Sequence, residues 1–312
     1  MKKMTLLATA AAIAATLGLS ACATGSESAP AAAAPALTSG IDQAAADAAP
    51  EAFRESGVVR VAAGIPYPPF IKVKDDGSFE GFDVDIAQAL GEKLDLDFAI
   101  SHQAFETVIP SLQSHKFDII MAGMNDTAER EKTLNFVDYI SAGFTIVVKA
   151  GNPEKIGTLL DLCGHSVAVQ KSTVQGEILR ELVTECEAEG KKGIDVQELP
   201  VANDAQTALK AGRVQAYVTD APVAAYTIAT AGDGKDFEGV DDPKNPQGFS
   251  PVYSGIGMLK ENGELTEAIR LAFQSIIDEG VYQEILEKHG MGHLGVPEAI
   301  VNGAGQTASP SD

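Results

Sequence analysis

Tryptophan is absent from this 312-residue sequence, and histidine, cysteine and basic residues are few. The five histidines are scattered and form no cluster typical of a zinc site. Lysine and arginine total 23 against 44 acidic residues, which gives a formal net charge of -21 and disfavours nucleic-acid binding, because phosphates require a basic face. We recognise no Ser-His-Asp spacing and no phosphate-binding loop. We therefore expect neither a cofactor nor catalysis.

The N-terminal residues have the features of an export signal. Two lysines precede an apolar run over residues 5–19, which is short for a membrane span. The run ends in Leu-Ser-Ala-Cys, which resembles a bacterial lipobox. The resemblance implies that the signal peptide 1–21 is removed and that Cys22 carries lipid. An ordinary secretory signal with an incidental cysteine is the alternative. Both interpretations predict an extracytoplasmic protein, and the first predicts one anchored to the cell membrane.

Both ends of the mature chain lack the pattern of a packed core. Residues 22–52 are rich in Ala, Pro, Ser and Thr and have few large apolar side chains. Such a segment cannot bury enough surface to order itself, so we predict a flexible tether. Residues 297–312 also lack periodicity, and we predict a disordered tail.

Strand and helix patterns alternate between these two ends. Apolar runs predict strands at 58–64, 79–82, 96–100, 117–120, 145–148, 166–169, 195–199, 216–220, 237–240 and 253–259. Helical spacing predicts helices at 84–94, 105–112, 173–189, 205–211, 265–279 and 281–289, another from Pro222, and a helical turn at 129–132. Asp83 is the expected N-cap of the first helix. This alternation indicates a mostly parallel sheet with helices on both faces.

Arg130 is the first candidate for a ligand contact. It follows a predicted strand and lies in the predicted helical turn. Free N–H groups at such a turn, the helix dipole and a forked guanidinium together suit a carboxylate. A solvated charge on a helix face is the alternative interpretation.

Other candidates lie at the same edge of the predicted sheet, outside the carboxyl ends of the strands, where ligands bind in such folds. Three prolines stiffen the loop that carries Tyr67 and Phe70, which either form walls for a small ligand or cover the core. Ser172 or Thr173 is expected to cap a helix. Asp220 either caps the next helix or accepts a hydrogen bond from a ligand ammonium group.

Six short motifs in this order resemble the polar amino-acid-binding proteins of bacterial ABC importers, solute-binding protein family 3. They are Tyr67-Pro-Pro-Phe70, Gly81-Phe-Asp-Val-Asp85, Ile109-Pro-Ser-Leu-Gln113, Asp126-Thr-Ala-Glu-Arg130, Val169-Gln-Lys-Ser-Thr173 and Tyr217-Val-Thr-Asp220. The resemblance implies an α/β fold of the type II periplasmic-binding-protein class, with the ligand in a cleft between two lobes. Lobe 1 would comprise 53–148 plus 253–296 and lobe 2 residues 149–252, joined by hinge strands near 147–149 and 251–254.

The family's site residues map onto individual positions of this sequence. The resemblance implies that Arg130 holds the ligand α-carboxylate and that Asp220 holds its α-ammonium group. Assisting groups are Gly123, Asn125 and Thr173, the aromatic wall is Tyr67 and Phe105, and Gln170 lies beside the ligand side chain.

Departures from the family pattern bear on the ligand. Asn125 stands where serine or threonine is usual, and Gly64 stands where binders of cationic side chains often carry aspartate. Because Gly64 and Gln170 are uncharged, a neutral polar amino acid is favoured and an acidic one is second. Glu106 would add negative charge if its side chain turned inward.

The resemblance also implies partners. A monomer would deliver the amino acid to an ABC permease with its ATPase subunits. The alternatives are a ligand-sensing surface lipoprotein without a transporter and a secreted dehydratase-like enzyme on the same fold.

Cys163 and Cys186 remain once Cys22 is assigned to lipid. An even pair in an exported protein suggests a disulfide. Two free thiols are the alternative.

Overall fold

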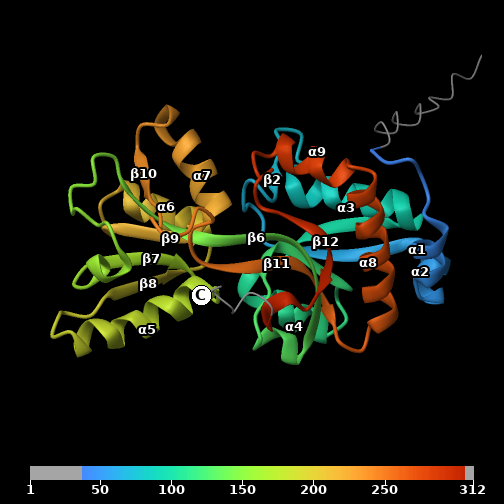
Figure 1. Ribbon diagram of the computed structural model, residues 1–312, viewed down its shortest axis with the longest axis horizontal. Helices are drawn as coiled ribbons and strands as arrows, with labels where there is room; N and C mark the ends of the chain where they lie inside the picture. Colours follow the sequence, from blue (N-terminus) through green and yellow to red (C-terminus); the bar gives the residue numbers. More distant parts are fainter. Residues whose placement is uncertain (1–36, 306–312) are drawn as a thin grey trace, which may run out of the picture. The chain divides into compact units, whose positions relative to one another are not determined.

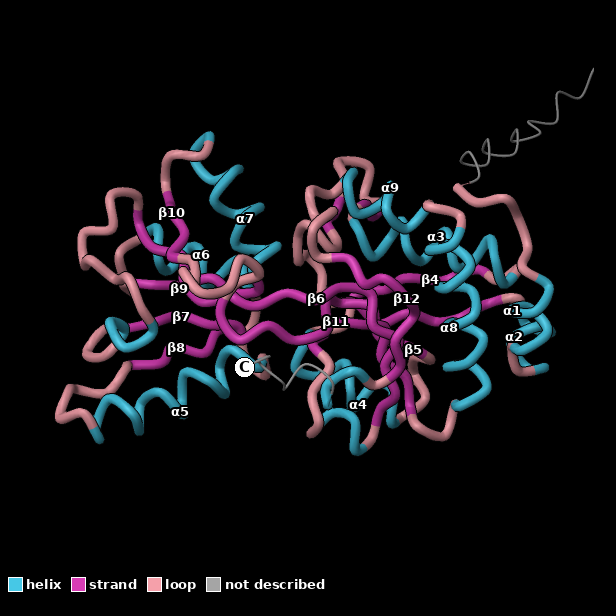
Figure 2. Tube along the Cα trace, in the orientation of Figure 1, coloured by secondary structure: helices cyan, strands magenta, loops and turns pink. Residues whose placement is uncertain are grey.

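A computed structural model describes residues 37–305, in which helices flank a mixed sheet (Figures 1 and 2). The strands are β1 (Val58–Ala63), β2 (Lys72–Val73), β3 (Phe79–Glu80), β4 (Asp97–His102), β5 (Ile119–Asn125), β6 (Leu134–Lys149), β7 (Ser166–Gln170), β8 (Asp195–Leu199), β9 (Ala216–Asp220), β10 (Phe237–Val240), β11 (Phe249–Leu259) and β12 (Gly295–Val301). The helices are α1 (Gln43–Ala48), α2 (Glu51–Ser56), α3 (Phe82–Leu94), α4 (Val108–Gln113), α5 (Val174–Ala188), α6 (Ala202–Lys210), α7 (Ala221–Thr230), α8 (Gly263–Asp278) and α9 (Val281–Lys288). Short 3-10 turns are η1 (Phe105–Thr107), η2 (Arg130–Lys132), η3 (Leu159–Leu162), η4 (Ala231–Asp233) and η5 (Gly303–Gly305).

Two long strands, β6 and β11, join two groups of elements (Figure 2). They pair antiparallel from Leu134–Leu259 to Phe144–Phe249. On one side the strand order continues from β11 through β5 and β1 to β4, and on the other from β6 through β9 and β7 to β8. The pairs of β1 with β4 and β5, and of β7 with β8 and β9, are parallel, as predicted. We call residues 37–142 with 252–305 lobe 1, and residues 144–249 lobe 2.

The first crossing lies earlier than the predicted hinge at 147–149. Residues 144–148 already pair with β9 inside lobe 2, and the predicted strand 145–148 is the last part of β6, a continuous strand of 16 residues. At the crossing itself, a Cβ on Gly143 would lie 2.4 Å from the carbonyl oxygen of Phe249. Glycine is therefore needed there for the two backbones to approach. The second crossing, at 249–252, overlaps the predicted segment 251–254.

The predicted tether is too long, because its last residues fold onto lobe 1. Asp42 caps α1 by accepting hydrogen bonds from the backbone N–H groups of Ala44 and Ala45. Before α1, the N–H groups of Leu37 and Thr38 donate to the Glu92 carboxylate of α3. Polar caps and side-chain contacts order a segment that hydrophobic periodicity did not reveal. The predicted signal peptide, Cys22 and tether residues 22–36 lie outside the described residues.

The predicted tail is also wrong at its start. Residues 295–301 form β12, which pairs with β6, and η5 follows. Asn302 then accepts a hydrogen bond from the backbone N–H of Phe136 at 2.8 Å. Pairing with β6 therefore orders this segment. Residues 306–312 lie outside the described range. No helix within 37–305 is long and apolar enough to cross a membrane.

The beginning of α3 also differs from the prediction. Gly81, not Asp83, is its N-cap, and Asp83 is fully buried as the second residue of the helix. The carboxylate accepts a hydrogen bond from the Gly123 N–H at 3.3 Å. Burial raises the pKa of Asp83 to about 7. Asp83 therefore links α3 to β5 inside lobe 1.

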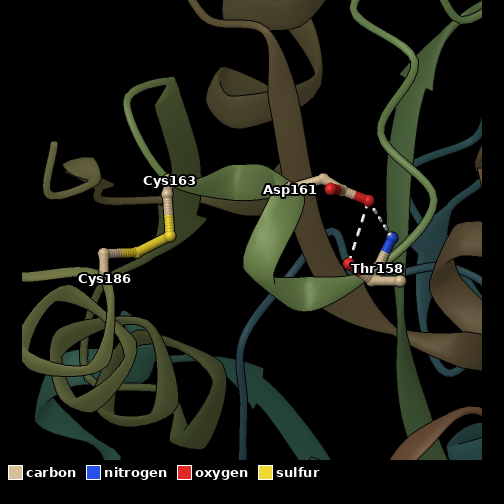
Figure 3. The surroundings of a disulfide bond; sticks show 4 residues. All are labelled: Thr158, Asp161, Cys163 and Cys186. Carbon is tan, nitrogen blue, oxygen red and sulfur yellow. Dashed lines mark hydrogen bonds between the residues drawn. A yellow bond between two sulfur atoms is a disulfide. The ribbon is translucent and has the colours of Figure 1, made fainter. Parts of the chain in front are cut away.

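The predicted pair of cysteines forms a disulfide in lobe 2 (Figure 3). Cys163 follows η3 and Cys186 lies near the end of α5, with their Cα atoms 5.7 Å apart. A capping box between Thr158 and Asp161 holds η3 in place before the bond. The disulfide links η3 to the C-terminal end of α5, the helix whose N-terminus faces lobe 1.

Candidate functional site

Asp220 of lobe 2 lies where the two lobes contact each other. It ends β9 in lobe 2 and is only 7% exposed. The Tyr67 hydroxyl of lobe 1 donates to Oδ2, and Asn125 Nδ2, also of lobe 1, donates to Oδ1 at 3.2 Å. Gln175 Nε2 of α5 donates to the same Oδ1 at 2.7 Å. Three residues from different segments therefore converge on one carboxylate.

The electrostatics of Asp220 are those of a buried acid. Burial raises its pKa above the usual range, while the three hydrogen bonds and the charge of Arg130 act in the opposite direction. Although Asp220 occupies the N-cap position of α7, its side chain makes no capping hydrogen bond. The predicted capping bond is therefore not formed, and the side chain faces lobe 1 instead.

Arg130 approaches the same region from lobe 1. Its Nη1 donates to the Asn125 carbonyl oxygen at 2.7 Å, and Nη2 donates across the lobes to the Ser172 carbonyl oxygen at 3.2 Å. The guanidinium carbon lies 5.8 Å from the centre of the Phe105 ring, within the range of a cation–π contact. Burial lowers the pKa of Arg130, and nearby carboxylates oppose this shift. The predicted solvated charge on a helix face does not describe this residue.

The predicted helical turn that carries Arg130 is present as η2, a single 3-10 turn of three residues. So short a turn offers little helix dipole to an anion. The Gly123 N–H, a predicted ligand donor, points to Asp83 instead. Gly123 has a φ of +57, and a Cβ there would lie 3.0 Å from the Phe70 ring. The glycine permits packing inside lobe 1, and Phe70 is a core residue that is 1% exposed.

A cavity of about 420 Å³ opens between the lobes beside Arg130. One wall comes from lobe 1, and a salt bridge of 2.7 Å between Glu106 and Lys171 of lobe 2 crosses it. Glu106 therefore turns toward the other lobe, as the sequence analysis allowed. The residues that line the cavity are Phe105, Glu106, Val108, Ile109, Pro110, Met124, Arg130, Lys171, Ser172, Glu177, Arg180 and Glu198.

Gln170 and Thr173 of lobe 2 stand in the sequence on either side of Lys171 and Ser172, which line the cavity. Thr173 caps α5, because its Oγ1 accepts from the Gly176 N–H at 3.4 Å, and the hydroxyl also donates to the Gln170 carbonyl oxygen at 2.7 Å. Gln170 Nε2 lies 3.5 Å from the Pro200 carbonyl oxygen. Gly64 belongs to the same region, since a Cβ built there would lie 3.6 Å from Phe105.

Three residues of the site were missed by the sequence analysis. Gln175 lies in the first turn of α5, two residues after the predicted cap, and that position is the only signal that could have identified it. Ser254 of β11 accepts from Asn125 Nδ2 at 3.0 Å, but a serine within a strand carries no such signal. Ser172 contributes its carbonyl group through a backbone conformation with φ +64. Such a conformation is uncommon for a residue other than glycine.

This arrangement suits a small zwitterion. Arg130 of lobe 1 lines the cavity, and its charge also acts on the buried carboxylate of Asp220 in lobe 2, which Tyr67 and Asn125 of lobe 1 contact. Two of the five guanidinium N–H donors of Arg130 bond to backbone carbonyls of the described chain. The other donors suit a carboxylate, and Asp220 suits an ammonium group.

Comparisons with known proteins agree with this geometry. Residues 59–292 match the family described as bacterial extracellular solute-binding proteins, family 3. The arginine-binding protein ArgT of Corynebacterium glutamicum is 34% identical over 257 residues, which cover 81% of each chain. The histidine-binding periplasmic protein of Salmonella typhimurium is 27% identical over 231 residues, or 74% of this chain and 86% of that protein.

Two solved structures have the same fold. An ancestral arginine-binding protein bound to glutamine has a TM-score of 0.67 and 34% identity, and the match covers 75% of this chain and 98% of that one. An ancestral amino-acid-binding protein, described as a precursor of cyclohexadienyl dehydratase, has a TM-score of 0.67 and 30% identity, with 76% and 97% covered.

Proposed function

Because the chain belongs to family 3 of the bacterial extracellular solute-binding proteins, we propose that it captures a free amino acid outside the cytoplasm and delivers it to an ABC permease. One observation carries this proposal. Asp220 of lobe 2 accepts hydrogen bonds from two residues of lobe 1, Arg130 of lobe 1 donates one to lobe 2, and the two opposite charges are near enough to influence each other's pKa.

The α-carboxylate of the ligand would bind Arg130, and its α-ammonium group would bind Asp220. The ammonium group would take over the acceptor sites that Tyr67 and Asn125 use on Asp220. A ligand that touches both lobes favours the closed arrangement through contacts that the open arrangement lacks. Binding and closure are therefore one event in this proposal.

The proposed preference among side chains follows from two positions at which the sequence departs from the family pattern. Gly64 and Gln170 contribute no charge, so we propose a neutral polar amino acid first and an acidic one second. The names of the relatives, which bind arginine and histidine, favour a cationic side chain instead, and Glu177 on the cavity wall would suit one. A single screen separates these possibilities.

The experiment is a thermal-shift screen of the mature protein with each of the twenty amino acids, followed by calorimetry on the best ligand. A ligand present at 100 times its Kd stabilises by about 2.7 kcal/mol, which is readily detected as a higher unfolding temperature. The proposal fails if no free amino acid shifts the unfolding temperature.

The dehydratase alternative has support from one structural relative, which is described as a precursor of cyclohexadienyl dehydratase. Recovery of the ligand unchanged after incubation would exclude this alternative.

The location of the protein is part of the proposal. We propose that lipid on Cys22 holds the protein at the outer side of the cell membrane and that it acts as a monomer. Metabolic labelling with a fatty acid, lost in Cys22→Ala, tests the anchor.

A further inference from the structure

Three carboxyl groups gather on the side of the Arg130 turn that faces the C-terminal residues. Asp126 directly follows Asn125, and Glu131 directly follows Arg130, so both belong to the loop that carries two proposed ligand contacts. Asp138 comes from β6. Asp126 and Asp138 are 1% and 0% exposed.

Residues 302–304, which we call the strap, close over this cluster. The Gly303 N–H donates to Asp138 Oδ2 at 3.0 Å. The Ala304 N–H is shared between Asp126 Oδ2 and Glu131 Oε1, each at 3.2 Å. A Cβ at Gly303 would lie 2.5 Å from the Tyr253 ring, so the strap is packed directly against β11.

The same cluster is tied to the binding loop through β11. The Asp126 N–H donates to the Tyr253 carbonyl oxygen at 2.8 Å, and Asn125 Nδ2 donates to Ser254 at 3.0 Å. Asp138 lies beside this strand, because a Cβ at Gly255 would be 2.7 Å from its Oδ1. A displacement of the strap or of the cluster would therefore be transmitted to Asn125 through β11.

In the part of the chain that the structure describes, no lysine, arginine or histidine side chain forms a salt bridge with these three carboxyl groups. The strap contributes backbone N–H groups and no charged side chain. Tyr253 faces the cluster from β11, and Arg130 acts on Asp126 at longer range while bonding elsewhere. Within residues 37–305, Oδ1 of Asp126 and Oδ1 of Asp138 have no hydrogen-bond partner, and no group of acidic side chains has the arrangement of a metal site.

Buried carboxylates without a cation are stable only when they take up protons. Burial raises the pKa of Asp126 to about 8, with further contributions from the charge of Asp138 and from Glu131. Burial likewise raises the pKa of Asp138 to about 7, while the Gly303 N–H opposes the shift. Each value exceeds the ordinary 3.8 of a free aspartate. The strap contacts both carboxyl groups, and its release would expose them to water, so we expect the docked arrangement to bind the protons more tightly than the released one.

We propose that Asp126 and Asp138 are positioning residues whose protonated forms hold the strap and the Asn125–Arg130 loop together, so that loss of the protons loosens the strap and weakens amino-acid binding. The link to binding rests on the function proposed above. The docking of the strap does not depend on that function. The favourable contribution is complete below about pH 4 and is lost as the pH rises through 7 to 8.

The first test needs no ligand and no variant. Hydrogen exchange of the Gly303 and Ala304 amides is measured from pH 6 to pH 9 and corrected for the intrinsic rate. For a group with a pKa of about 7 in the docked state, the ratio of docked to released strap falls about tenfold over this range. A ratio that is constant across this range would overturn the proposal.

The second test compares variants and binding. Asp138→Asn and Asp126→Asn remove the titrating groups and are expected to flatten the exchange profile to less than about a threefold change. Glu154→Gln, the same kind of change at an exposed position of lobe 2, should keep the wild-type profile. A purely structural role would shift protection equally at all pH values.

Calorimetry with L-arginine and L-glutamine as probes, at pH 6 and pH 8, connects the strap to the site, because the α-ammonium group of each probe stays largely protonated over this range. The tighter of the two probes is expected to bind at least about threefold more weakly at pH 8, and the Asn variants should lose this difference. If both probes fail to bind while strap exchange follows the pH, the proposed choice of ligand fails and the proton-dependent strap stands. If a probe binds and its affinity is independent of pH, the link between strap and site is refuted while amino-acid binding stands.

Discussion

Substitution of Asp220 by asparagine should have opposite effects on binding and on stability. The carboxylate is 7% exposed and accepts hydrogen bonds from Tyr67, Asn125 and Gln175. An amide keeps one acceptor oxygen but loses the charge that would hold a ligand ammonium group. A hydrogen bond to a charged group contributes about 1.5–3 kcal/mol, so we expect affinity to fall about 10- to 150-fold.

Stability should respond differently, because the charge of Asp220 is costly to bury. Burial raises its pKa above 3.8, so its favourable contribution to folding is complete only below that value and is lost as the pH rises through the folded pKa. Asp220→Asn removes this dependence. The variant should therefore unfold at the wild-type temperature or above it at pH 7, and its advantage should grow with pH.

The assay is calorimetric titration with the best ligand of the amino-acid screen, with unfolding followed between pH 5 and pH 8 in its absence. Glu185→Gln, the same carboxylate-to-amide change at an exposed position of α5, is the matched control and should change neither quantity. An unchanged Kd for Asp220→Asn would refute the assignment of this residue to the ammonium group. A large loss of stability would show that the carboxylate has a structural role instead.

Three further outcomes follow from the site and its support. Arg130→Ala should weaken calorimetric binding at least about tenfold, since it removes the guanidinium that would pair with the carboxylate, and unchanged affinity would exclude that pairing. Replacing Cys163 and Cys186 by serine should lower the free energy of unfolding by about 3 kcal/mol for a separation of 23 residues, and denaturant titration that finds no loss would contradict this value. Ser172→Gly should raise thermal stability by about 1 kcal/mol, because φ +64 disfavours a residue with a Cβ, and a lower midpoint would contradict the strain.

Much of the fold was predictable because its elements carry regular apolar patterns. α3 buries Phe82, Ile86 and Leu90, residues four apart, and α8 buries Leu265 and Ile269 in the same way. The parallel strands β1 and β7 read as short apolar runs. Such patterns record which side chains are buried, and burial is what decides the position of these elements.

The predictions were wrong where polar contacts, or the close approach of two backbone segments, determine the structure. The ordering of residues 37–42 depends on Glu92 and on the cap Asp42, and neither has an apolar pattern. The crossing at Gly143 depends on the distance between two backbones. Of the site, Arg130 and Asp220 were identified through motif order, whereas Ser254 depends on strand register and could not be.

The strand register places both sides of the site directly against the crossing strands. Asp220 is the β9 partner of Phe144, which immediately follows Gly143 at the first crossing. Asn125 is the β5 partner of Ser254, which lies two residues after Val252 at the second crossing. A rotation of one lobe about these crossings would therefore move Asp220 relative to Asn125 without any flexible segment between hinge and contact. In the proposed function, a zwitterion that bridges the two lobes would therefore favour closure at the hinge directly, because paired backbones connect the ligand contacts to the crossing strands.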